Sequence, residues 1–213
     1  MFDGVIDVSH YQGPNIDFAA AAASGIAAVI HKATQGTSVV DPMLATNRTK
    51  AQAANLRFGS YHFGTAEDGG AQAEFYLRTV GPNPGELLAL DFESSTAGPS
   101  MTLEEARAFV SLVQSRTGKW PVLYAGHYLK DLLAGQADPL LSQCPLWLAQ
   151  YGPSAVLPAG WGRWTLWQWT DGTIGAPQPV PGVGHCDRDR YIGTAEDLGA
   201  FWDSVSAEPA RTA

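Results

Sequence analysis

Cysteine and long apolar runs are both scarce in this sequence, and each shortage excludes a class of protein. Only two of the 213 residues are cysteines, Cys144 and Cys186, and they form no C-x-x-C pattern that would indicate a metal or redox site. We expect two independent buried thiols, since a disulfide would require both to flank one groove. The longest apolar runs are far shorter than the roughly 20 residues of a membrane-spanning helix, so no membrane insertion is expected.

Basic residues are also few. The 13 lysines and arginines are outnumbered by 21 aspartates and glutamates, which gives a net charge of −8 and a pI of about 4.9. Because no basic stripe is available for phosphates, nucleic acid is not expected as a partner. An anionic polymer would have to be recognised by a shaped groove, because long-range attraction is lacking. The five histidines show no metal-ligand spacing, and no phosphate loop or dinucleotide fingerprint is present, so neither a metal nor a cofactor is expected.

Short apolar runs that alternate with amphipathic segments make up most of the chain. Strands are expected at residues 4–8, 26–33, 57–63, 87–92, 122–124, 146–150 and 165–169, and helices at residues 18–24, 42–55 and 71–80. Two capping boxes, Thr102 with Glu105 and Thr194 with Asp197, predict where two further helices begin. Repeated strand–helix–strand units indicate a parallel sheet with right-handed crossovers.

About eight strands predict that the sheet closes into a barrel. We expect a single irregular α/β barrel of the TIM-like (β/α) type with eight strands and about five to six helices. Its second half should be helix-poor, because the later connections are short. The domain is expected to span residues 1–205, and the small polar residues 206–213 predict a flexible C-terminal tail. In such a barrel, catalytic side chains lie at the C-terminal ends of the strands.

The most informative strand end is Asp91-Phe92-Glu93. Side chains alternate along a strand, so Asp91 and Glu93 point the same way, with Cα atoms about 6–7 Å apart. Two carboxylates that point together repel, which raises the pKa of one and leaves the other ionised. Glycoside cleavage needs this split between a proton donor and an anion. A salt-bridged or metal-binding pair is the alternative interpretation of the same triplet.

Further carboxylates and many aromatic side chains occur at the other strand ends. Asp7 ends the first strand, and Asp187 and Asp189 belong to the last motif. Asp7 and Asp187 together with Asp91 and Glu93 would suit a magnesium ion. Seven tryptophans and seven tyrosines instead favour a sugar groove, in which flat rings stack on pyranose units.

The ordered set of motifs resembles glycoside hydrolase family 25, the Chalaropsis-type lysozymes. The similarity begins with the Asp3–Gly13 segment DGVIDVSHYQG and spans nearly the whole chain in the family's order. The motifs that follow are NIDF from Asn15, VIHKATQG from Val29, GSYHF from Gly59, LDFE from Leu90, LWLA from Leu146, LWQWT from Leu166 and DRDRY from Asp187.

The resemblance implies an irregular eight-stranded barrel and N-acetylmuramidase activity on peptidoglycan. By motif position, Glu93 would be the proton donor, and Asp91 would stabilise positive charge or the substrate's N-acetyl group. Asp7 and Asp187 would complete an acidic floor. The residues expected to line the sugar subsites are Tyr61, Tyr124, Trp147, Gln150, Gln168 and Asp189. The family more often has Asn where this chain has Asp189, so Asp189 is an alternative to Asp187 as the floor carboxylate.

The sequence does not decide between several catalytic routes, functions and cellular locations. A protein nucleophile, an inverting water and the substrate's own acetamido group are three candidate routes, of which we favour the third, which is retaining. A catalytically silent wall-binding module and a chitinase-like hydrolase are alternative functions. The chain opens without a visible signal peptide, so we expect an extracellular or wall-released protein that leaves the cell by phage-type release, by another export route, or after removal of a leader. We expect a monomer.

Overall fold

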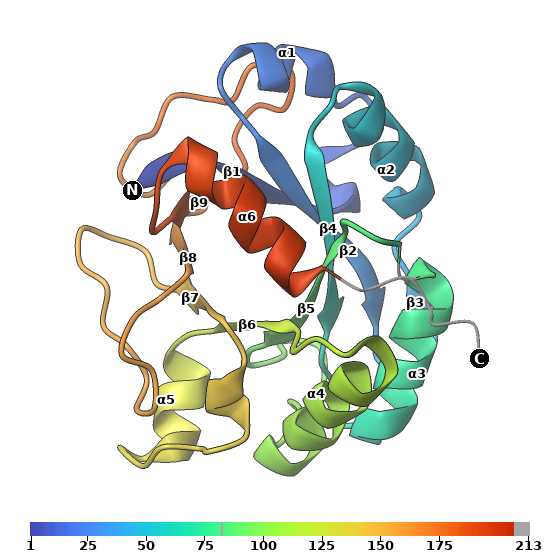
Figure 1. Ribbon diagram of the computed structural model, residues 1–213, viewed down its shortest axis with the longest axis vertical. Coiled ribbons are helices and arrows are strands. Elements are labelled where there is room, and N and C mark those ends of the chain that lie inside the picture. The colour runs from blue at the N-terminus through green and yellow to red at the C-terminus, as the bar shows by residue number, and fades with distance from the viewer. Residues whose placement is uncertain (82, 207–213) are drawn as a thin grey trace.

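The computed structural model describes residues 1–81 and 83–206, and its strands close into a barrel (Figure 1). Eight strands form the wall, and the pairing of β1 with β2 completes the circle. Their order around the barrel is β1 (Phe2–Val8), β9 (Asp187–Tyr191), β8 (Leu166–Thr170), β7 (Leu146–Ala149), β6 (Val122–Ala125), β5 (Leu87–Phe92), β4 (Arg57–Phe63) and β2 (Ala28–Gln35). The two-residue strand β3 (Val39–Val40) pairs with β2 outside the circle.

Six α-helices belong to the described residues: α1 (Phe18–Ala23), α2 (Leu44–Ala53), α3 (Gly69–Val80), α4 (Leu103–Thr117), α5 (His127–Leu133) and α6 (Ala195–Val205). Two short 3-10 helices, His10–Gln12 and Leu141–Gln143, complete the set. The connections from β7 to β8 and from β8 to β9 contain no helix. The expected irregular eight-stranded α/β barrel with a helix-poor second half is therefore confirmed.

Both predicted capping boxes are present. The backbone N–H of Glu105 donates to Thr102 Oγ1 at 3.3 Å, and the Thr102 N–H donates back to Glu105 Oε2 at 2.6 Å. Thr194 and Asp197 make the same reciprocal pair at the start of α6. Each box satisfies backbone donors that the first helical turn leaves unpaired, which is why the sequence marks these two helix starts clearly.

The last strand departs from the expected parallel sheet. β9 runs antiparallel to both of its neighbours, β1 and β8, whereas the other barrel pairs are parallel. A helix-free connection can bring a strand back antiparallel, because no crossover is needed. β3 and α5 were not expected either. α5 begins after Gly126, which has no capping side chain and lies so close to the Ala149 carbonyl that a Cβ would stand 2.5 Å from its oxygen.

Apolar side chains fill both sides of the barrel wall. The larger cluster packs between the wall and the surrounding helices, and it includes Phe18, Phe92 and Phe109. A second cluster lies inside the barrel, where Val5 and Ile30 face the helix α6. α6 lies across one end of the barrel (Figure 1), and its Trp202 is fully buried and donates to the Phe58 carbonyl at 3.1 Å. One end of the barrel is thus closed by a helix, and any site must use the other end.

Two smaller features of the described residues complete the fold. Cys144 and Cys186 are both buried and free, as expected from the sequence. Ser206, the first residue of the expected tail, is buried and bridges to Leu87, while residues 207–213 lie outside the described part of the chain. Among the described residues, no helix combines the length and the apolar character needed to cross a bilayer.

Candidate active site

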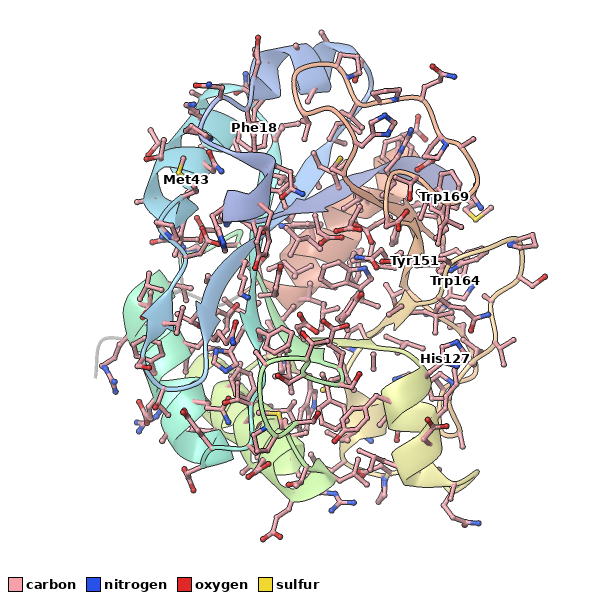
Figure 2. The ribbon with its side chains drawn as sticks, turned by 180° about the vertical axis from the view of Figure 1, so that it is seen from behind. Phe18, Met43, His127, Tyr151, Trp164 and Trp169 are labelled. Carbon is pink, nitrogen blue, oxygen red and sulfur yellow. The ribbon has the colours of Figure 1, made fainter. Side chains whose placement is uncertain are left out.

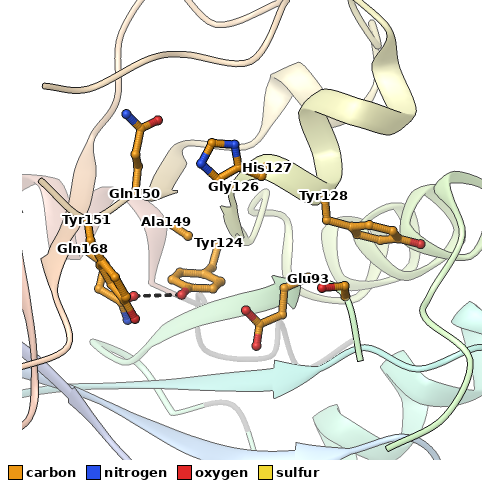
Figure 3. Close-up of a pocket in the computed structure, with 10 residues that line it drawn as sticks. Glu93, Tyr124, Gly126, His127, Tyr128, Ala149, Gln150, Tyr151 and Gln168 are labelled. Carbon is orange, nitrogen blue, oxygen red and sulfur yellow. Dashed lines mark hydrogen bonds between the residues drawn. The ribbon is translucent and has the colours of Figure 1, made fainter. Parts of the chain in front are cut away.

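A groove crosses the end of the barrel opposite α6, at the carboxyl ends of the parallel strands. It consists of a central hollow of about 170 Å³ between two arms of about 380 and 350 Å³. Glu93 lines all three hollows, so the groove is centred on this side chain. The larger arm is drawn in Figure 3, with Glu93 facing Tyr124 and Gln168 from the opposite side.

Asp91 and Glu93 lie together in the groove, as the alternation along β5 predicts. In the sheet, Asp91 stands between Phe63 of β4 and Tyr124 of β6. It is 6% exposed, and its Oδ1 has no hydrogen-bond partner among the described residues. An unpaired buried carboxylate oxygen is costly. Asp91 also lines the central hollow and the smaller arm, so its carboxyl group can meet a ligand in the groove.

The pKa values of this pair are raised mainly by burial. For Asp91 the pKa is raised well above its usual value by burial and then by the neighbouring Glu93, and for Glu93 burial raises the pKa. The Lys32 ammonium opposes both shifts, and its own pKa is lowered by burial. Lys32 is held by Gln35 at 2.8 Å and lies 4.8 Å from the centre of the Phe63 ring. Burial thus favours a proton on the pair, and the repulsion between the two groups favours placing it on only one of them.

Asp7 and Asp187 bring further negative charge to the centre of the groove. They are direct partners across the β1–β9 contact, and both line the central hollow. Burial raises the pKa of Asp187 to about 6, with contributions from Asp171 and Glu93. For Asp7, burial and then Asp187 raise the pKa well above its usual value.

Asp189 lies beneath the groove. It is fully buried, and its Oδ1 accepts a hydrogen bond of 2.6 Å from the Trp147 indole N–H. The direction of β9 explains this depth: the antiparallel strand enters from the groove, so Asp187 comes first and Asp189 lies farther in. Both point into the barrel, as alternation predicts. Of the two candidates for the floor carboxylate, Asp187 is the one that lines the groove.

The other residues expected from the motifs form a connected layer around the acids. Tyr124 donates to Gln168 Oε1 at 2.8 Å, the bond drawn dashed in Figure 3, and Gln168 Nε2 donates to Asp7 Oδ2 at 2.8 Å. Trp147 is in edge-to-face contact with Tyr124, with ring centres 4.8 Å apart, and with Tyr61 at 6.4 Å. Burial raises the pKa of both tyrosines, so their hydroxyls stay protonated and can donate.

Comparison with known proteins gives this arrangement a family. The model of glycosyl hydrolases family 25 matches residues 6–176 of the chain. This chain belongs to that family. It is a glycoside hydrolase of the lysozyme type, which confirms the resemblance seen in its motifs.

The names of individual similar proteins are consistent with the assignment of this chain to the lysozymes. An N,O-diacetylmuramidase of a Chalaropsis species is 31% identical over 183 residues, which cover 78% of this chain and 86% of that protein. A bacterial lysozyme of Streptomyces coelicolor superposes with a TM-score of 0.85 at 27% identity, covering 97% of this chain and 99% of the other. A muramidase of Trichobolus zukalii gives 0.82 at 32% identity, with 95% and 99% covered.

Gln150 lies in the larger arm of the lysozyme's groove, but both ends of its amide are already bonded. Lys130 donates to its Oε1 at 2.7 Å, and its Nε2 donates to the Ser154 carbonyl at 2.7 Å. Tyr151, His127 and Tyr128 line the same arm, and none of them was among the residues expected to line the sugar subsites. Figure 2, seen from the side opposite to Figure 1, shows Tyr151 between the labelled His127 and Trp169. This arm therefore offers more aromatic surface than the motifs indicated.

Two further residues of the lysozyme's groove, Lys32 and Tyr11, were missed by sequence reasoning. Lys32 follows Ile30 on the same strand face, and Ile30 lies inside the barrel, so alternation places Lys32 inside too. Tyr11 lies in the smaller arm and is 82% exposed. Its ring centre is 4.2 Å from that of His10, which is bonded to the buried Asp41 at 2.8 Å. The HYQ sequence after the first strand was the available signal.

The described residues contain no group of three or more His, Cys, Asp and Glu side chains arranged to hold a metal ion. The groove carboxylates are instead distributed between its centre and the buried layer below. Carboxylates placed in this way can each exchange a proton or accept a hydrogen bond at a different point of a molecule bound in the groove.

Proposed function

We propose that this lysozyme cleaves the β-1,4 bond between N-acetylmuramic acid and N-acetylglucosamine in peptidoglycan, with retention and with help from the substrate's acetamido group. The observation that carries the proposal is the unpartnered, buried Oδ1 of Asp91 beside Glu93, whose pKa is raised by burial. The muramyl residue carries a 2-acetamido N–H next to its anomeric carbon. Asp91 can accept this N–H, which directs the acetamido oxygen toward the reacting carbon.

Binding of the acetamido N–H also decides where the proton of the pair resides. A hydrogen bond donated to Asp91 lowers its pKa, so the shared proton settles on Glu93. Glu93 then gives this proton to the glycosidic oxygen as the bond to the anomeric carbon breaks. The acetamido oxygen bonds to that carbon and forms a cyclic oxazolinium ion, whose charge Asp91 stabilises.

The second half of the reaction returns the proton. Glu93, now a carboxylate, takes a proton from a water molecule, and the water oxygen attacks the anomeric carbon from the side that the leaving sugar occupied. The oxazolinium ring opens to the acetamide, and the product keeps the original anomeric configuration. Lys32 supports the ionised states, since its ammonium lowers the pKa of both carboxyl groups.

The groove accounts for recognition of an anionic polymer by an acidic protein. The chain carries a net charge of −8, so contact has to come from shape, stacking and hydrogen bonds. Glu93 lies between the two arms, which can each hold sugars on one side of the cleaved bond. Because peptidoglycan lies outside the cytoplasmic membrane, we propose that the enzyme acts there after secretion or release.

Digestion of purified peptidoglycan, followed by borohydride reduction and mass spectrometry, tests the reaction. Reduced muramic acid ends are expected from the wild type and not from Glu93→Gln. Absence of fragments from a wild type that still sediments with the walls would favour a wall-binding module, and cleavage of chitin alone would favour a chitinase-like enzyme. Proton NMR then tests the route, since a first product of inverted configuration contradicts the acetamido mechanism. Peptidoglycan without N-acetyl groups should resist cleavage.

A further inference from the structure

Asp189 is a buried carboxyl group that the reaction above does not use. Its side chain is fully buried in β9, and none of the groove hollows reaches it. Oδ1 accepts the Trp147 indole N–H, whereas Oδ2 is buried and accepts from no amide, hydroxyl or cationic donor among the described residues. Across the β1–β9 pair, Asp189 is the partner of Val5 and Asp187 is the partner of Asp7, so Asp7 and Asp189 point into the barrel as diagonal neighbours.

A hydrogen bond between two carboxyl groups requires a proton on one of them, because carboxylate oxygens only accept. The contacts of the two groups decide which one carries it. Asp189 Oδ1 accepts from Trp147, and its Oδ2 is left without a donor. Asp7 Oδ2 accepts from Gln168 Nε2, which leaves its Oδ1 to carry a proton. Asp187 lies directly opposite Asp7 on β9, so a negative charge on Asp7 is the less favourable of the two.

No cation compensates this pair. None of the ion pairs formed by the described residues involves Asp7 or Asp189. Of the two arginines that flank Asp189 on β9, Arg188 is paired with Asp3 at 3.3 Å and Arg190 lies 4.1 Å from the centre of the Trp169 ring. Two adjacent buried carboxylates without a cation do not both ionise. The charged and titratable groups that face the pair are Asp187 on β9, Cys186 just before that strand, Asp3 on β1, Asp91 on β5, and the phenols Tyr61, Tyr124 and Tyr151.

We propose that Asp7 and Asp189 share one proton at neutral pH, and that Asp189 is a positioning residue which, as the ionised partner, keeps Asp7 neutral. Asp7 then presents an uncharged group to the groove, beside Asp187 and Asp91. The negative charge stays one layer deeper, where the Trp147 N–H stabilises it. This arrangement limits the repulsion among the groove acids. Its consequence for catalysis rests on the proposed function, whereas the protonation of Asp7 does not.

The substitution Asp189→Asn removes the negative charge but keeps the size and shape of the side chain. Asparagine can keep the acceptor for Trp147 and offer an N–H to Asp7, so the packing is retained. Asp7 must then ionise, which moves the negative charge into the groove beside Asp91 and Asp187. The acid limb of the kcat/KM profile on peptidoglycan is expected to move to higher pH by about one unit, because a nearby like charge raises the pKa of the remaining acids. The matched control Asp131→Asn, at an exposed position of α5, should leave the profile unchanged.

Carbon-13 NMR of aspartate-labelled protein provides a readout that needs no activity. In the wild type, the Asp7 carboxyl, assigned by its loss in Asp7→Asn, should be protonated at neutral pH. In Asp189→Asn it should be ionised. If Asp189→Asn fails to fold, Trp147→Phe is the second variant: it removes the donor to Asp189 and should shift the shared proton toward Asp189.

Two results would overturn the inference: an Asp7 that titrates as an ordinary aspartate in the wild type, or a pH profile that Asp189→Asn does not move. If the wild type shows no muramidase activity, the NMR result still decides whether the pair shares a proton. The proposed function and the proton-sharing pair are therefore tested separately.

Discussion

Asp7 and Asp187 are directly paired across the antiparallel contact between β1 and β9. Acidic side chains opposite one another on neighbouring strands repel, which lowers the stability of the sheet. Burial strengthens the effect, since it raises the pKa of Asp187 to about 6 and keeps that of Asp7 well above its usual value. The lysozyme therefore holds two buried acids opposite one another at the place where its barrel closes, and ionisation of Asp187 there is unfavourable.

Replacing one member of this pair should raise the stability of the folded protein and lower its enzymatic activity. Asp187→Asn removes a buried charge at neutral pH, and we expect the free energy of unfolding to rise by about 1–2 kcal/mol, which corresponds to roughly 2–8 °C in Tm for a chain of this size. Cleavage of peptidoglycan should fall, since the acidic floor loses a carboxylate. Calorimetry and a turbidity assay of walls measure the two effects. An unchanged or lower Tm would contradict this account, and Asp131→Asn is the matched surface control.

The stability of the wild type should rise on mild acidification. The folded pKa of Asp187, about 6, is higher than that of an unfolded aspartate, so the native state binds protons more tightly than the unfolded chain. The ionised Asp187 carboxylate destabilises the folded state fully above pH 6, and this effect disappears as the pH falls toward about 4. Below that range Asp41 and Asp138, whose pKa values are lowered by hydrogen bonds, lose their stabilising effect. Tm measured against pH should therefore peak between about 4 and 6, and Asp187→Asn should flatten the rise.

Lys32 should set the pH range of activity. Its ammonium lowers the pKa of Asp91 and Glu93, so Lys32→Met should raise both and move the acid limb of the kcat/KM profile to higher pH. A shift of about one unit is expected for the loss of one nearby opposite charge. Lys32→Arg, which keeps the charge, is the control and should retain most of the wild-type position. Identical profiles for the Met and Arg variants would show that Lys32 does not tune these acids.

Much of the catalytic centre could be predicted from the sequence, because two simple rules apply to it. Alternation places Asp91 and Glu93 on one face of β5, and the barrel rule places that strand end in the site. Asp187 was assigned on motif order alone. Its depth relative to Asp189 depends on the direction of β9, and the polar DRDRY segment contains no pattern that tells an antiparallel strand from a parallel one.

The remaining features depend on contacts between distant segments. Lys32 was not selected, because a lysine at a strand end normally lies in water, and only the closed barrel places it against Asp91. α5 was missed because its first residue follows a glycine instead of a capping side chain. β3 consists of two exposed valines, too few for a periodic pattern. These are the places where the tertiary fold overrides local sequence preference.

The exposed ring of Tyr11 should contribute to binding of long glycan strands. It lies in the smaller arm of the groove, next to His10, which the buried Asp41 holds in place. Tyr11→Ala should raise KM for long strands several-fold, with little effect on kcat, because stacking on a pyranose ring is lost away from the cleaved bond. Tyr11→Phe keeps the ring and should behave as the wild type. An equal loss of kcat in both variants would show that the hydroxyl, and not stacking, matters.

Closure of the barrel by α6 should dominate the stability of the fold. Trp202→Ala removes a fully buried indole and the hydrogen bond to the Phe58 carbonyl, and it should lower the free energy of unfolding by about 3–5 kcal/mol. Denaturation in urea measures the change. Leu132→Ala, at a position 40% exposed on α5, is the control and should cost less than about 1 kcal/mol. A small effect at Trp202 would mean that the barrel interior is packed without α6.

The pairing of β1 with β9 also bears on the order in which the groove is assembled during synthesis. Asp7 is made some 180 residues before Asp187, yet the two must meet before the pair of acids exists. Contacts of such long sequence separation form late and slowly in folding. A ribosome-bound fragment that already carries Asp91 and Glu93 still lacks Asp187, and therefore the acid opposite Asp7. On the proposed roles, hydrolytic activity is expected only after the last strand has left the ribosome and closed the circle.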